Sequence, residues 1–188
     1  MKPTILFLSL FALISCKPSE KSPESPETGT APAQSTSSLD AILLPGAPTG
    51  AVSVTEARKD PSPGKEITIS GDIIGRTNVF VPNRAMLILG DPGVITSCNR
   101  ISGDGCPTPW DVCCDDPDVI SKSIATVQVV DADGNLLKSG LKGLGGMKEL
   151  SQLVVQGTIA DGSSADNLVI NATGIHVASV EPNHSPKE

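Results

Sequence analysis

The residues best suited to chemistry in this sequence are four cysteines that lie close together in the chain. Cys98, Cys106, Cys113 and Cys114 follow the spacing C-x7-C-x6-C-C. Thiols grouped in this way can form disulfides, hold a metal ion or carry out redox chemistry. Zinc sites of this type usually contain C-x2-4-C pairs, and thiol redox sites usually contain C-x-x-C. Neither pattern is present, so the spacing alone is typical of neither a metal site nor a redox site.

If these cysteines form disulfides, two pairings are open. A bond between the neighbours Cys113 and Cys114 would close a strained ring, so we discount it. The first remaining pairing joins Cys98 to Cys113 and Cys106 to Cys114, and the second joins Cys98 to Cys114 and Cys106 to Cys113. Each bridge would be worth roughly 2–3 kcal/mol in the chain-entropy model. Either pairing would staple a segment rich in Gly, Pro and Asp, residues 92–124.

The compartment in which the chain works decides between these possibilities, and the N-terminus indicates it. Lys2 precedes an apolar run from Ile5 to Ile14. The run is too short to cross a bilayer, which takes roughly 20 residues, and it is typical of a secretory signal peptide. It ends in Leu13-Ile14-Ser15-Cys16, which resembles the lipobox of bacterial lipoproteins. The resemblance implies that residues 1–15 are removed and that Cys16 is lipidated.

The membrane is thus the one partner that the N-terminus identifies, through the lipidated Cys16. Lys17 follows the anchor in place of Asp, and by resemblance to lipoprotein sorting this favours the outer membrane, facing the periplasm or the cell surface. Residues 16–39 carry the anchor and a tether rich in Pro, Ser and Glu, which we expect to be disordered. A single folded domain is expected over residues 40–182, followed by a short tail at 183–188.

Export places the four cysteines of the 92–124 segment in an oxidising compartment, where an even number of cysteines is typical of disulfides. Two structural disulfides are therefore our first expectation, and a metal site or a redox site built from the same thiols is the alternative. Trp110 lies inside this segment. We expect it to cover the disulfides, and its other role would be an exposed contact for a sugar or a protein partner.

The elements that must position this segment are strands. Apolar and polar residues alternate, or apolar runs end at turn residues, over 66–75, 79–81 with 85–89, 125–130, 154–159 and 168–177. A spacing of three or four residues predicts a two-turn helix over 147–153. The order β-β-β-α-β-β resembles that of the OB-fold, with the closest local likeness at Val155-Gln156-Gly157 and Ala172–Ile175. The expected class is mainly β: a small OB-like five-stranded barrel with one short helix and a disulfide-stapled insertion.

Composition excludes several classes of function. The formal net charge is −7 and only 2% of the residues are aromatic, so a basic groove or a base-stacking surface for nucleic acid is not expected. No nucleophile, base and acid can be grouped into a catalytic set, and no cofactor motif is present. We expect a non-enzymatic, lipid-anchored envelope protein whose domain binds a protein partner or a small ligand or serves structurally; the alternative is a metal-binding or redox lipoprotein.

Overall fold

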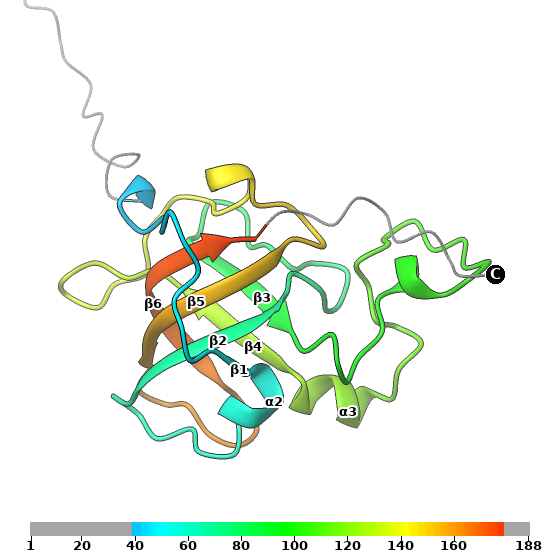
Figure 1. Ribbon diagram of the computed structural model, residues 1–188, viewed down its shortest axis with the longest axis horizontal. Coiled ribbons are helices and arrows are strands. Elements are labelled where there is room, and N and C mark those ends of the chain that lie inside the picture. Colours follow the sequence, from blue (N-terminus) through cyan, green and yellow to red (C-terminus); the bar gives the residue numbers. More distant parts are fainter. Residues whose placement is uncertain (1–38, 179–188) are drawn as a thin grey trace, which may run out of the picture. The chain divides into compact units, whose positions relative to one another are not determined.

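A computed structural model describes residues 39–178 and shows a protein built mainly of β-strands (Figure 1). Five strands close into a barrel in the order β2-β3-β4-β6-β5, and β5 pairs again with β2. All neighbours are antiparallel except β4 and β6, which are parallel. The expected OB-like five-stranded barrel is confirmed. Its strands are β2 (Glu66–Asp72), β3 (Met86–Gly90), β4 (Ile124–Gln128), β5 (Gln152–Ile159) and β6 (Val169–Val177).

The barrel forms because alternate side chains of each strand point into one shared core. In β5, Leu153, Val155 and Ile159 are buried while Gln152 and Gln156 are exposed. This period of two is the pattern of a strand with one buried face. The interior is filled by aliphatic side chains from every strand, as in other small barrels. Residues buried to 0% exposure in this core are Val54, Ile69, Ile73, Ala85, Leu87, Leu89, Val127, Leu153, Val155, Ile170 and Ile175.

Short segments before the barrel cover the strand edges that the barrel leaves unpaired. β2 and β3 share only the pair Asp72–Gly90, and β1 (Val52–Ser53) runs parallel to β2 beside this gap. The helix α2 (Val54–Ala57) follows β1 directly. Residues 42–44 lie along β6, where the Leu44 amide donates to the carbonyl of Ile175. Covered edges protect a barrel from pairing with other chains.

The prediction of a helix over residues 147–153 is wrong. The short 3-10 turn η2 (Leu144–Gly146) precedes this segment, and β5 already begins at Gln152. Leu150 has a φ of +68°, which an α-helix does not allow, and its amide donates to the carbonyl of Ile73. Met147 and Leu153 are both buried, but Leu153 is buried as part of a strand. The apolar spacing thus arises from a turn followed by a strand.

The segment inserted between β3 and β4 carries a small core of its own. It contains the 3-10 turn η1 (Cys98–Arg100) and the helix α3 (Pro117–Lys122). Ile95, Val112 and Ile120 of the insertion pack on Ile74, which lies two residues after the end of β2, and all four are at most 2% exposed. The insertion is therefore a packed extension of the barrel.

Several expectations concern residues that the structure does not describe. The signal peptide at 1–15, the lipidation site Cys16, the tether up to residue 38 and the tail at 183–188 lie outside the described residues. Between residues 39 and 178, no helix is long and apolar enough to cross a membrane.

Candidate functional site

Three of the four expected cysteines meet at one point on the insertion. Cys98 lies in η1 and is 2% exposed, while Cys113 and Cys114 are exposed in the turn that follows Val112. The three Sγ atoms lie within 4.8 Å of one another, and those of Cys98 and Cys113 are 3.7 Å apart. The sequence places 14 residues between these two sulfurs, and the fold brings them into contact.

The expected disulfides are not present in the structure. A disulfide joins its sulfurs at about 2.05 Å, whereas Cys98, Cys106, Cys113 and Cys114 are all unpaired. The physical reason is the shape of the cluster. The Cys98 sulfur faces both Cys113 and Cys114 instead of a single partner, and the Cys106 thiol contacts the Thr108 hydroxyl at 3.3 Å and the Thr108 carbonyl oxygen at 3.5 Å.

Backbone hydrogen bonds hold the cluster together. The segment that leads into Cys113 lies between a loop of the barrel and η1. On one side, the Gly75 amide donates to the Trp110 carbonyl at 3.1 Å, and the Val112 amide donates to the Gly75 carbonyl at 2.8 Å. On the other side, the Cys98 amide donates to the Asp111 carbonyl at 2.8 Å. Residues 110–112 therefore fix the position of Cys113 relative to Cys98.

Trp110 and Asp111 add side-chain contacts to the same junction. The indole Nε1 of Trp110 donates to the Thr77 carbonyl at 3.0 Å, and its half-buried ring packs against the cores of both the barrel and the insertion. Asp111 is 7% exposed and its Oδ2 accepts from the Thr77 hydroxyl at 3.2 Å. Its Oδ1 is buried and has no hydrogen-bond partner among the described residues. Asp111 cannot be assigned to this junction from the sequence alone, because its partner Thr77 lies in a distant loop.

The electrostatic surroundings keep the buried thiol protonated. Burial raises the pKa of Cys98 strongly, and the neighbouring Cys106, Asp104 and Cys113 raise it further. The pKa of Cys114 is raised, chiefly by Cys113. The pKa of Cys106 is lowered by hydrogen bonds from Thr108. Reactive redox cysteines lie in electropositive surroundings that lower the thiol pKa, so Cys98 lacks the environment of a redox nucleophile.

Other acidic residues of the insertion serve local structure. The Asp116 carboxylate accepts from the amides of Asp118 and Val119 and caps α3. The Asp115 carboxylate accepts from the amide of Thr96 at 2.6 Å. Within residues 39–178, the cysteines alone form a group with the geometry to hold a metal ion.

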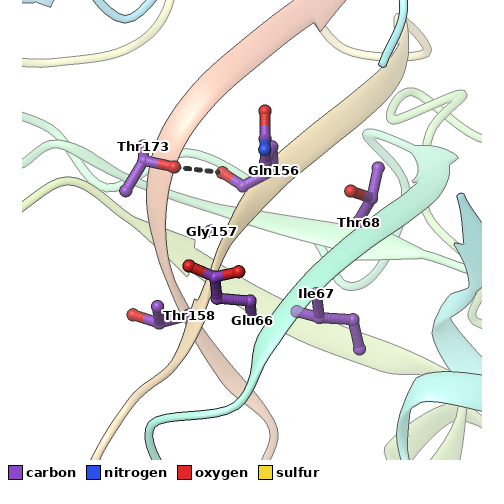
Figure 2. A pocket seen from close by; sticks show the side chains of 7 residues that line it. All are labelled: Glu66, Ile67, Thr68, Gln156, Gly157, Thr158 and Thr173. Carbon is purple, nitrogen blue, oxygen red and sulfur yellow. Dashed lines mark hydrogen bonds between the residues drawn. The ribbon is translucent and has the colours of Figure 1, made fainter. Parts of the chain in front are cut away.

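A polar groove runs along the outer wall of the barrel, on β2, β5 and β6 (Figure 2). Its volume is about 210 Å³, and a bulge between Gln156 and Gly157 shapes its floor. Thr173 donates its hydroxyl to the Gln156 carbonyl at 3.3 Å across the groove. The groove is lined by Glu66, Ile67, Thr68, Gln156, Gly157, Thr158 and Thr173. Its wall lacks a charged side chain that is buried and aimed at a ligand.

A second hollow, of about 430 Å³, lies where α2 and α3 meet the β5–β6 loop. Val94 and Val119 line it and are 47% and 40% exposed. Arg58 also lines it, but its guanidinium donates to the carbonyls of Ile124 at 2.8 Å and Ala165 at 3.0 Å. Arg58 therefore fastens the loop to the barrel, and the cysteine cluster remains the group with the clearest chemistry.

Comparison with known proteins does not assign the site. No protein-family model and no curated protein matches this chain. The interpretation of the site therefore depends on its residues and their geometry.

Proposed function

We propose that the chain is a non-enzymatic, lipid-anchored protein of the cell envelope that binds its ligand through the cysteine-bearing insertion. The observation that supports this most is the cluster itself. Two of its thiols, Cys113 and Cys114, are exposed to solvent, and the insertion that carries them is packed on a filled barrel. A rigid scaffold that presents a few exposed polar groups is the general form of a ligand site.

The surroundings of the thiols support binding over catalysis. A catalytic cysteine needs a base within hydrogen-bond reach. His176 lies on β6, and its Nδ1 is 3.2 Å from the carbonyl oxygen of Leu44. Asp104, the acidic neighbour of the thiols, raises the pKa of Cys98 rather than lowering it. This arrangement favours a protein that holds a ligand.

The lipid anchor is supported by the sequence at Cys16 and is tested by substitution. The full chain is produced in a bacterial host that is fed a labelled fatty acid, and its membrane and soluble fractions are compared. Wild type should be labelled and membrane-bound, and Cys16→Ser should be unlabelled and uncleaved. Cys114→Ser is the matched control because it removes an exposed thiol from the domain, and it should behave as wild type. Labelling of Cys16→Ser at the level of wild type would refute the anchor.

A further inference from the structure

The spacing of the sulfur atoms in the cluster is that of a thiolate metal centre. Zn–S bonds are about 2.3 Å long, so two thiolates of a tetrahedral site lie about 3.8 Å apart. The Sγ atoms of Cys98 and Cys113 are 3.7 Å apart, and both lie within 4.8 Å of the Cys114 Sγ. Small side-chain movements would place all three sulfurs at bonding distance from one ion.

We propose that Cys98, Cys113 and Cys114 bind a single thiophilic metal ion, with Cys106 available for the fourth position. This inference names the ligand of the insertion site and so rests on the function proposed above. Thiolates are soft ligands that select Zn²⁺ or Cu⁺ over Mg²⁺ and Ca²⁺. Cys113 and Cys114 are exposed, so an ion can enter from solvent, while the buried Cys98 forms the floor of the site.

Cys106 is the fourth thiol of the same loop system. Its side chain is half-buried and contacts the hydroxyl of Thr108 at 3.3 Å. With the ion present, a thiolate bond replaces the weak contacts to Thr108. The sulfurs of Cys98, Cys113 and Cys114 already lie together, whereas that of Cys106 must turn toward them. We therefore expect Cys106 to contribute less to the metal affinity than the other three cysteines.

The charges around the cluster favour a cation. The Asp104 carboxylate accepts from the amide of Cys106 at 2.9 Å and so adds negative charge beside the fourth thiol. Arg100, the basic residue of η1, has its charge paired: its guanidinium lies 2.9 Å from the carboxylate of the buried Asp72. Each thiol that binds the ion gives its proton to solvent, and the ion compensates the thiolate charge that would otherwise accumulate near Asp104.

A structural disulfide is the competing use of the same thiols. Joining Cys98 to Cys113 would consume two ligands and leave Cys114 beside the bond. Formation of that disulfide removes two electrons and two protons, which an oxidant of the envelope would have to accept. The two interpretations predict opposite results for the isolated protein. A metal site requires free thiols that react with a thiol reagent, whereas a disulfide leaves Cys98 and Cys113 unreactive.

The test titrates the full-length lipidated chain, purified in detergent under reductant and without oxygen, with Co²⁺ and then with Zn²⁺. One Co²⁺ per chain should give the thiolate charge-transfer absorption of a tetrahedral site, and Zn²⁺ should displace it, whereas Mg²⁺ and Ca²⁺ should not. Cys113→Ser and Cys114→Ser should each weaken Zn²⁺ binding by more than about 100-fold, because the hydrogen-bond partners of metal ligands alone contribute about 10–100-fold. Cys106→Ser should weaken it by about tenfold.

Two comparisons make the result specific. Cys16→Ser removes the lipid anchor but leaves the insertion unchanged, so it should bind Zn²⁺ as wild type does. Cys98→Ser alters a buried position, so the fold of this variant is checked by circular dichroism. If it unfolds, the conclusion rests on the variants at the exposed Cys113 and Cys114. Absence of Co²⁺ absorption with four titratable domain thiols would overturn the proposal, as would a Cys98–Cys113 disulfide in protein isolated without added oxidant. Both results leave the anchor test at Cys16 untouched, so the two failures are distinguishable.

Discussion

Replacing Gly157 by alanine should destabilise the barrel at the closest approach of two strands. Gly157 lies in β5 at the bulge opposite β6, on the floor of the outer groove (Figure 2). A Cβ built on it would lie 2.3 Å from the carbonyl oxygen of Asn171 and 3.0 Å from the Cα of Ala172. Both neighbours belong to the backbone, so no side-chain rotation can relieve the contact. The strands themselves must separate.

The size of the effect follows from that separation. An ordinary van der Waals contact begins at 3.4 Å, so β6 must retreat locally by about 1 Å. Overpacking of this kind costs about 1–3 kcal/mol, and a weakened backbone hydrogen bond adds about 1 kcal/mol. A total near 3 kcal/mol corresponds to a fall of about 6–12 °C in Tm for a domain of this size.

The assay is thermal unfolding of the full chain, followed by circular dichroism, with Gly46→Ala as the matched control. A Cβ at Gly46 would meet nothing within 4 Å. Surface substitutions of this kind stay within about 0.5 kcal/mol, so the control Tm should remain within about 2 °C of wild type. Equal Tm values for the two variants would refute the reasoning, because they would mean that β5 and β6 do not approach each other as described.

Two further predictions concern the junctions of α2 and of the insertion. Burial acts to raise the pKa of Asp91, but hydrogen bonds from Thr55, Ser53 and Gly93 together hold it below the usual value of 3.8. Asp91 therefore stabilises the fold above pH 3.8, and this contribution is lost as the pH falls through the lowered pKa. Asp91→Asn should lower the Tm at pH 7, and below pH 4 the Tm of the variant should fall less steeply than that of wild type. Trp110→Phe removes the hydrogen bond to Thr77 at a cost of about 1 kcal/mol. In hydrogen exchange, residues 91–123 should exchange faster while β2 and β5 keep their protection, and loss of protection in both regions would show that the junction supports the barrel as well.

The barrel could be predicted from sequence because its strands carry their signal locally. β5 and β6 show alternation that reflects one buried face, and the turns between strands are marked by Gly, Asp and Pro. The helix expected over 147–153 failed for a non-local reason. The positive φ of Leu150 accompanies its hydrogen bond to Ile73, a residue distant in sequence. The sequence contains a signal for the helix α3, because Asp116 followed by Pro117 is a standard helix start. The helix was not predicted, because the surrounding Asp-rich sequence is typical of a loop.

The cysteine cluster could be predicted only in part. Its location between β3 and β4 follows from the strand order, whereas the partners of each thiol cannot be deduced from spacing. Cys113 approaches Cys98 because residues 110–112 hydrogen-bond to Gly75 on one side and to Cys98 on the other. Those contacts join segments that lie far apart in the chain, and no periodicity or turn signal encodes them.

The same contacts explain how a barrel with a filled interior can support chemistry outside it. Val112 is fully buried against Ile74, and the next residue in the chain is Cys113. The core of the insertion thus fixes Cys113, the exposed thiol one residue after Val112. Cys98 is held by the hydrogen bond that its amide donates to the Asp111 carbonyl. A site of three sulfurs needs its ligands fixed to within about 0.5 Å. Here that precision comes from packing at the end of the barrel, so the insertion needs no covalent staple to present its thiols together.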